Sequence, residues 1–598
     1  MKFIIDKKHL IDPAIFFSGF VIILIIAQNL NFPGGKIKMG GEIWSDKAHY
    51  YAYLPAVFIY HFEAAKYPAD IEEKTSSGFP PDLKNNKIYI KTTCGVSILV
   101  APFFIMAHVT ASLLNLEMDG FSMIYQRMAV VAGVFYLMLG LFFLKKVLDN
   151  YFRSWISYIT LLFLLAGTNL YFYGLDDVLM SHVYSFFLMS LFLYLLKIFY
   201  NEQKRKYVHF ILLSIVASML ILIRPTNIVI LPIALFFDVH SAKEIGKRVC
   251  LFLKPLHLIT LFVIAFLVVL PQLIYWKYAY GAFLHYTYTD EGFTNWLHPR
   301  IIEIWFSPLN GLFLYNPILI FMIAGILLMI FKRIQNGIFI LGFFLFISYL
   351  FSSWGVWYFG GAHGYRPFVD FYPLLVLPFG YFIRDSLRIR NLLLKSLIFL
   401  LIIFFSFFNV KLIYNFQCFT GSTWGWDDFL KTLDRAGLYN LERNKFTYLN
   451  DFENITLNDG IPKTCSESHS YSRSSYMVED MVYNWYYIRR IDDVIRHKAI
   501  KTASLSLWIR PKDCDKTGSC AVFKISDDQD KTLYIKFIQM DDFPALKNHW
   551  TKVTGIFVVP DSINPTNYFS FFLWNKGQKS FYIDDMKIIF DSRADKNN

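Results

Sequence analysis

Long apolar runs recur through the first 410 residues, and they constrain the fold of this 598-residue chain more than any other feature. A helix needs about 20 apolar residues to cross roughly 30 Å of hydrocarbon. We therefore expect about eleven spanning helices, at about 13–31, 124–144, 155–173, 181–199, 208–223, 226–238, 256–280, 311–331, 336–352, 367–383 and 393–410. The chain is 55% hydrophobic and 19% aromatic, which excludes an ordinary soluble enzyme and predicts a polytopic α-helical membrane protein.

Lysine and arginine gather in alternate loops, as they do on the cytoplasmic side of membrane proteins. This pattern predicts a cytoplasmic N-terminus, with inner loops near 145–153, 204–206, 243–248, 332–333 and 384–390. The outer loops are then 32–123, 174–182, 281–310 and 353–367. The orientation requires that the apolar stretch 94–116 does not cross, so we expect it to lie in or dip into the outer leaflet. The net charge of +12 then reflects topology and indicates no nucleic-acid partner.

The character of the chain changes after residue 410. We expect a 1–410 membrane domain, a 411–442 linker and an extracytoplasmic all-β domain at 443–598, in a bacterial inner membrane. Apolar and polar residues alternate at 503–510, 532–538 and 580–588, which is typical of strands in a sandwich. The phrases Asp451-Phe-Glu453 and Tyr582-Ile-Asp-Asp585 resemble jelly-roll modules that bind carbohydrate. A structural or acceptor-positioning module is the alternative.

Cysteines are concentrated in this last part of the chain. They are Cys418, Cys465, Cys514 and Cys520, four of the six in the sequence. The turn-rich segment between Cys514 and Cys520 is one that a disulfide would close, and an oxidising periplasm permits such a bond. No second close pair or histidine partner accompanies it, so the spacing does not indicate a zinc site.

Asp46 follows the first apolar run and precedes an aromatic stretch that includes Tyr50 and Tyr51. Such rings suit both the membrane interface and the faces of sugar rings. Taken alone, an acid at this position indicates a solvated loop residue or a helix cap, since serine and aspartate, as at Ser45 and Asp46, both cap helices well. In these aromatic surroundings, an acid would instead meet lipid-linked substrates.

At these residues the chain resembles the GT-C superfamily of membrane glycosyltransferases, near the protein O-mannosyltransferase and aminoarabinose-transferase branch. The resemblance covers about 10–410. It rests on Asp46 in the first outer loop, the embedded segment after Lys91, the acids Asp176 and Asp177, and Arg366 in Gly364-Tyr-Arg-Pro367. This chain has Lys91-Thr-Thr93 where the branch often has Lys-Pro-Pro.

The resemblance implies transfer of a hexose or pentose from a polyprenyl phosphate to an extracytoplasmic hydroxyl or amine, with inversion. Asp46 would be the general base. Arg366, Arg224 and Lys91 are the candidates to hold the phosphate, against the alternatives of snorkelling and membrane anchoring. Asp177, ahead of Asp176, would bind substrate or support the base. Tyr50 and Tyr51 would contact substrate. No cofactor is assigned, and the use of a divalent metal by Asp46, Asp177 and His182 stays open, with His182 favoured as a polar residue near a helix start.

Two other classes of protein stay open. A glycolipid transporter or flippase would place charge deeper in the helices than the outer loops. A non-catalytic scaffold that binds polysaccharide through the outer sandwich would have no need of Asp46. The sequence does not identify the sugar, the polyprenol, the acceptor or the oligomeric state.

Overall fold

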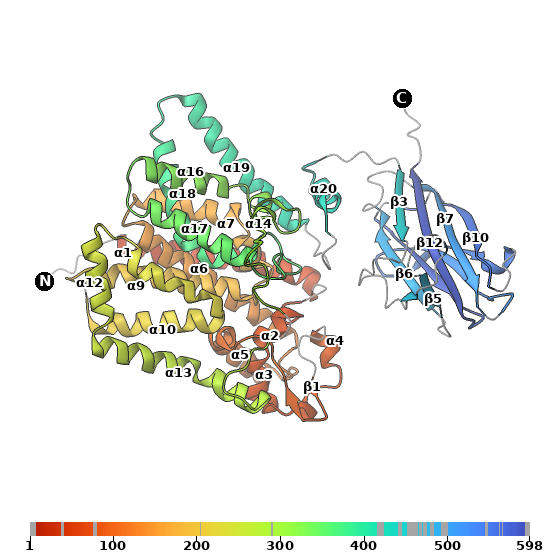
Figure 1. The fold of residues 1–598 in the computed structure, drawn as a ribbon, viewed down its shortest axis with the longest axis horizontal. Helices are drawn as coiled ribbons and strands as arrows, with labels where there is room; N and C mark the ends of the chain where they lie inside the picture. Colours follow the sequence, from red (N-terminus) through yellow and green to blue (C-terminus); the bar gives the residue numbers. More distant parts are fainter. Residues whose placement is uncertain are drawn as a thin grey trace. The chain divides into compact units, whose positions relative to one another are not determined.

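The computed structural model describes residues 8–37, 41–75, 81–203, 205–288, 291–415, 424–439, 445–450, 464–465, 469, 475–478, 483–491, 500–512, 514–543, 548–560, 562–564 and 566–592. The chain divides into two compact units, Met1–Phe416 and Gln417–Asn598. The first unit is helical and the second consists mainly of strands (Figure 1). Lys204, Cys418, the side chain of Cys465 and the 451–453 phrase lie outside the described residues.

Five long helices of the first unit contact one another in succession, and Figure 1 shows three of them, α9, α10 and α13, side by side. α1 (Lys8–Asn31) packs against α6 (Met123–Leu148), which packs against α9 (Ser181–Tyr200). α9 in turn contacts α10 (Tyr207–Ile223), and α10 contacts α13 (Pro255–Tyr280).

A second group of helices joins this row through α9. α18 (Tyr372–Ser386) contacts α9 and also packs against α16 (Leu319–Phe331) and α7 (Ser154–Gly167). α7 contacts α19 (Leu392–Tyr414), and α16 contacts α17 (Gly337–Ser352). The shorter elements of this unit are η1 (Pro33–Gly35), α2 (Asp46–Tyr51), α3 (Tyr53–Pro55), η2 (Ala56–Tyr60), η3 (Ala64–Lys66), α4 (Ile71–Thr75), β1 (Pro81–Asp82), β2 (Lys87–Ile88), α5 (Gly95–Leu113), α8 (Leu170–Leu175), η4 (Pro225–Ile230), α11 (Leu231–Phe236), α12 (Ala242–Phe252), α14 (Ile301–Phe306), α15 (Leu312–Tyr315) and η5 (Arg366–Phe371).

Six helices in the described part of the chain are long and apolar enough to cross a bilayer, namely α1, α5, α6, α9, α13 and α19. α1, α13 and α19 expose apolar side chains to their surroundings, with Phe262 and Phe266 of α13 as examples. Exposed apolar faces of this kind fit lipid better than water. The chain is thus a mostly helical protein compatible with a membrane. Five further apolar helices have 10–17 residues, and the prediction of eleven spans stays a prediction.

The predicted interfacial stretch 94–116 contains α5, a 19-residue helix that packs against α6. Its length and composition place it among the six candidate spans. The expectation that α5 lies in the outer leaflet therefore stays a prediction. If α5 crossed the membrane, the side assigned to every later loop would be reversed.

The four predicted outer loops meet at one end of the helices. Figure 1 shows α2, α3, α4 and β1 at this end, with α12 at the opposite end. Backbone hydrogen bonds join the third loop to the fourth, from Asn295 N to Ser353 O (3.0 Å) and from Gly355 N to Gly292 O (2.8 Å). Contacts between side chains, described below, join the other loops.

Predicted inner segments also contact one another. Asp12 near the start of α1 pairs with Lys146 (2.6 Å) and with the buried Lys145 (2.9 Å) at the end of α6. Lys197 near the end of α9 pairs with Asp238 (2.6 Å), which precedes α12. These ion pairs join the start of α1 to the end of α6, and the end of α9 to the segment before α12.

The second unit contains two antiparallel sheets and the helix α20 (Trp426–Arg435). One sheet has the order β10-β7-β12-β5-β4, with β3 also paired to β12, and the other has the order β6-β11-β8-β9. The strands are β3 (Lys445–Asn450), β4 (Thr464–Cys465), β5 (Ser475–Val478), β6 (Tyr483–Arg490), β7 (Ile500–Pro511), β8 (Cys520–Ser526), β9 (Thr532–Gln539), β10 (Thr551–Val558), β11 (Tyr568–Trp574) and β12 (Phe581–Ser592). The predicted strands at 503–510, 532–538 and 580–588 fall in β7, β9 and β12.

Side chains from both sheets form one core. Phe523 of β8 stacks on Phe557 of β10 at 4.9 Å between ring centroids, and Phe569 of β11 lies 4.5 Å from Phe590 of β12. The two sheets therefore pack face to face across a core of their own. In the described part of the chain, no disulfide joins Cys514 to Cys520, so the prediction of this bond is wrong.

Candidate functional site

Asp46 is the first residue of α2, in the loop between α1 and α5. The preceding Ser45 has a φ of 49° and makes no side-chain capping bond, so its backbone is strained at this point. Its amide donates to the Thr75 carbonyl at 2.9 Å, which ties the start of α2 to the end of α4. Asp46 is therefore not the N-cap of this helix. Its side chain remains 62% exposed.

Arg366, at the start of η5, lies beside Asp46. Its Nη2 is 3.7 Å from Asp46 Oδ2, and its side chain is only 15% exposed. This distance is too long for a hydrogen bond, so the two groups attract one another as charges while the carboxylate stays accessible. Burial lowers the pKa of Arg366, but Asp46 raises it and the net change is upward. Gly364, with a φ of 64°, lets the chain pass close to Asn316 just before this arginine.

A second guanidinium is held close by. Arg224, between α10 and η4, donates to Asp370 Oδ2 at 3.2 Å, and Asp370 Oδ1 lies 2.8 Å from His182 Nδ1. The side chains of Asp370 and His182 are each 2% exposed. Nδ1 of His182 also lies 3.2 Å from Nη1 of Arg224, so it either donates to Asp370 or accepts from Arg224, depending on the tautomer of the imidazole. Asp370 thus joins α9, α10 and η5 beneath Arg224.

Both arginines lie within electrostatic range of Tyr288. Arg224 and Arg366 each lie near enough to Tyr288 to lower its pKa, although burial and Tyr50 raise that pKa overall. Asp46 also acts on Tyr288. The two guanidinium groups, the exposed carboxylate and two phenol rings are therefore neighbours at the end of the helices where the loops meet.

Asp177 reaches this region through a lysine. Lys47, next to Asp46 in α2, forms a 2.8 Å ion pair with Asp177 Oδ1 and lies 3.5 Å from Glu42 Oε1. Glu42 Oε2 accepts from the Val178 amide at 3.1 Å. Burial lowers the pKa of Lys47, but the charges of Asp177 and Glu42 raise it by more. The net change in pKa is upward, so the ammonium stays charged. Asp177 therefore anchors α2 to the loop before α9.

Lys91 is already paired. Its Nζ lies 2.8 Å from Glu291 and 4.8 Å from the centroid of the Tyr288 ring. Its amide contacts His49 Nδ1 at 3.4 Å. Burial lowers the pKa of His49 to about 4, an effect that Lys91 strengthens and Asp46 opposes, so His49 is neutral near pH 7.

The structure does not bring every predicted residue to this cluster. Tyr51 is 1% exposed, and its hydroxyl donates to the Gly120 carbonyl at 2.6 Å, so it belongs to the core beside α5. Asp176 directly follows α8, and its charge helps to raise the pKa of Lys47. Tyr50, in contrast, lies near Arg366.

Four charged residues of this region were not predicted from the sequence, namely Glu42, Lys47, Glu291 and Asp370. Asp370 had a readable signal, because an acid inside the apolar run 367–383 needs a partner to be tolerated there. The other three lie in loops that contain several charges, where composition alone does not distinguish paired residues.

Within the described residues, no group of three or more histidine, cysteine, aspartate or glutamate side chains is arranged to hold a metal ion. The set of Asp46, Asp177 and His182 does not provide one, since Asp177 binds Lys47 and His182 binds Asp370. The described residues therefore do not fit a metal at this site.

No protein-family model and no curated protein matches the chain. Among solved structures, the chain is similar to the CBM22-2 xylan-binding domain of Paenibacillus barcinonensis Xyn10C, with 14% identity, a TM-score of 0.19, and coverage of 24% of this chain and 99% of that one. The CBM22-1 domain of the same protein gives 15% identity, a TM-score of 0.18, and coverage of 25% and 95%. An arabinose-bound α-L-arabinofuranosidase, MgGH51, gives 11% identity, a TM-score of 0.16, and coverage of 26% and 24%. Similarities this low define neither the fold nor the function of this chain.

Proposed function

We propose that this chain is a membrane glycosyltransferase of the GT-C type, which transfers a sugar from a polyprenyl phosphate to an acceptor outside the cytoplasm. An eleven-span helical domain and a jelly-roll-like outer domain are part of this proposal. The observation that carries it is an exposed carboxylate, Asp46, beside the mostly buried Arg366, with Arg224 held in the same cluster.

Asp46 would act as the general base. In the reaction, it takes the proton from the acceptor hydroxyl or amine while the acceptor atom attacks the anomeric carbon of the sugar. The bond from that carbon to the phosphate oxygen breaks on the opposite face, so the configuration inverts. A positioned base contributes roughly 10²–10⁴ in rate. The 62% exposure of Asp46 leaves its oxygens open to an arriving acceptor.

The arginines would hold the leaving phosphate. Negative charge increases on this group as the bond breaks, and fixed donors in a water-poor site stabilise it best. Guanidinium groups suit phosphate because they offer two parallel donors. Arg366 and Arg224 are each 15% exposed, so both are partly shielded from water. Lys91 has a smaller role in this proposal, since its ammonium already pairs with Glu291.

The position of the cluster also bears on the alternatives. Its charged groups lie in loops and at helix ends, with His182 the second residue of α9 and Arg224 directly after α10. A flippase would be expected to carry such groups nearer the middle of its helices. A purely sugar-binding scaffold gives no reason for two arginines beside an exposed carboxylate.

The test is a direct assay of donor cleavage. Purified full-length protein is incubated with a panel of polyprenyl-phosphate sugars and candidate acceptors, and polyprenyl phosphate is measured by mass spectrometry. We expect release with at least one donor, and loss of release in Arg366→Ala. Absence of release across the whole panel, with protein that retains its fold, would contradict the proposal.

A further inference from the structure

The outer domain contains a separate pocket at one end of its four-stranded sheet, at the edge of the face that points away from the core. Its volume is about 530 Å³, within the roughly 300–1,000 Å³ range of ligand sites. It is lined by Gly518, Cys520, Phe537, Gln539, Trp574, Lys576 and Gly577. These residues belong to the second unit alone, so the pocket is independent of the Asp46 cluster.

Strand register places the side chains of the pocket on one face. Trp574 of β11 pairs with Cys520 of β8, and Cys520 pairs with Gln539 of β9, so the three form a row across the sheet. Phe537, two residues before Gln539, lies on the same face. Its ring centroid is 6.3 Å from that of Trp574, with the ring planes inclined by 49°. The pocket therefore has two aromatic walls at an angle.

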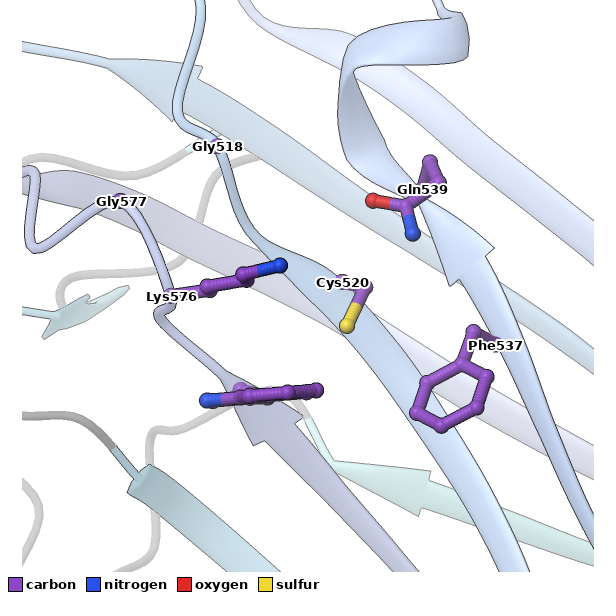
Figure 2. Close-up of a pocket in the computed structure, with 7 residues that line it drawn as sticks. Gly518, Cys520, Phe537, Gln539, Lys576 and Gly577 are labelled. Atoms are coloured by element: carbon purple, nitrogen blue, oxygen red, sulfur yellow. The ribbon is translucent and has the colours of Figure 1, made fainter.

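Polar groups complete the lining. Gln539 is exposed and offers both a donor and an acceptor. Lys576 is also exposed, with its ammonium 5.7 Å from the Trp574 ring centroid. Figure 2 shows the Lys576 side chain extended toward Cys520, with Gln539 and Phe537 on the neighbouring strand. Burial raises the pKa of Cys520, so its thiol adds no charge.

The rim of the pocket is rigidly built. Asp541 accepts hydrogen bonds from the amides of Thr517 (2.8 Å) and Gly518 (2.9 Å), which fixes the first rim loop. A Cβ on Gly577 would lie 2.2 Å from the Thr517 carbonyl oxygen, so only glycine lets the second rim loop approach the first. Ser519 donates to Asn575 at 2.8 Å and joins the two loops again. Such a site changes little on binding, which lowers the entropic cost of association.

We propose that this pocket binds a glycan. A sugar ring has an apolar face of C–H groups, which packs on aromatic rings, and a rim of hydroxyl groups that both donate and accept hydrogen bonds. Phe537 and Trp574 match the face, and Gln539 and Lys576 match the rim. A purely apolar ligand would make no use of the amide and the ammonium, and a small anion would make no use of the two rings.

The test measures binding of oligosaccharides to full-length protein in nanodiscs. The probes are hexamers of β-1,4-linked glucose, xylose and mannose and of galacturonic acid, and binding is followed by saturation-transfer NMR and calorimetry. We expect at least one hexamer to bind. Trp574→Ala should weaken this binding by about tenfold or more, which corresponds to 1.4 kcal/mol. Gln539→Ala should also weaken it, and because Gln539 is exposed, this substitution does not threaten folding.

Tyr568→Ala is the matched control, because Tyr568 is an exposed aromatic residue on the same strand β11, outside the pocket. Its affinity should equal that of the wild type. Affinity should also be kept in Asp46→Asn and Arg366→Ala, which distinguishes this pocket from the transfer site. Failure of every hexamer to bind would overturn the proposal, as would binding that Trp574→Ala and Gln539→Ala both leave unchanged.

Discussion

At the scale of single residues, the contrast between exposure and burial separates the roles in the cluster. The carboxylate of Asp46 is accessible and lies 3.7 Å from Arg366, whereas the carboxylate of Asp370 is buried and engaged by two partners. A base has to meet its substrate, but a carboxylate that orients an arginine does not. These two acids therefore give two different predictions.

Asp46→Asn keeps the size of the side chain but removes the basic carboxylate. If Asp46 is the base, turnover should fall by roughly 10²-fold or more, while the KM for the donor changes little. Initial rates with the best donor measure this effect. Asp70→Asn, in the same loop, removes an acid that pairs only weakly with Lys74 at 3.5 Å and should leave the rate unchanged. Wild-type turnover in Asp46→Asn would contradict the mechanism.

Asp370→Asn should act on donor binding through Arg224. The asparagine side chain has no charge with which to hold the guanidinium of Arg224, so the KM for the donor should rise by about tenfold or more. His182→Gln removes the other partner of Asp370 and should raise the KM less, since the pair between Arg224 and Asp370 is kept. Thermal unfolding measured in parallel separates this effect from general destabilisation. An unchanged KM in a folded Asp370→Asn protein would show that Asp370 does not position Arg224.

At the scale of elements, α2 is a helix of only six residues that depends on its neighbours. Isolated helices of this length are unstable in water, so packing and ion pairs have to hold it. Lys47 ties it to the loop before α9, and His49 lies against the backbone of Lys91. The position of Asp46 depends on both contacts.

Lys47→Ala should destabilise the membrane domain, because it leaves Glu42 and Asp177 without their shared cation. Breaking a buried ion pair costs about 3–5 kcal/mol, which would lower the melting temperature in detergent. The matched control is Lys66→Ala, which removes an exposed pair with Glu63 worth at most about 1 kcal/mol. Equal melting temperatures for the two variants would mean that the Lys47 pair does not hold α2.

The stability of this region should also depend on pH through His49. Burial lowers the pKa of His49 to about 4 in the folded protein, from 6.5 in the unfolded chain. Between these values the unfolded chain binds a proton that the folded chain does not, so stability falls as pH is lowered from 6.5 to 4. His49→Gln cannot titrate and should flatten this part of a plot of melting temperature against pH. The same slope in both proteins would contradict the assignment.

At the scale of the whole molecule, charge and packing divide the loops of the helical unit in the same way. The predicted outer loops meet around Asp46, and the predicted inner segments meet around Asp12 and Asp238. Loops on one side of a membrane are the ones able to touch. The predicted orientation can therefore be tested at positions far from the site.

Single-cysteine labelling from each side of sealed vesicles tests this topology. Asp70→Cys in the first loop and Lys531→Cys in the outer domain should react with a membrane-impermeant reagent from the periplasmic side. Arg388→Cys and the native Cys250, which is exposed in α12, should react only from the cytoplasmic side. Labelling of both groups from one side would refute the orientation and the site with it.

Much of the local structure follows from sequence alone. Apolar runs form the helices and alternating runs form β7, β9 and β12, because the pattern of apolar residues along a segment decides which face it can bury. Loop position and the scarcity of basic residues on that side, together with the resemblance to GT-C enzymes, selected Asp46 and Arg366 as candidates, and the structure places them 3.7 Å apart.

Only the tertiary structure decided the partners. Arg224 and Asp370 are 146 residues apart in sequence, and no local pattern links them. Tyr50 and Tyr51 are equivalent by sequence pattern, but successive helical residues point about 100° apart, so Tyr51 packs against α5 while Tyr50, which is also buried, lies near Arg366. The sequence determines where charges and rings lie along each segment. Which of them meet is determined by the packing of segments distant in the chain, because only that packing removes their charges from water and requires each to have a partner.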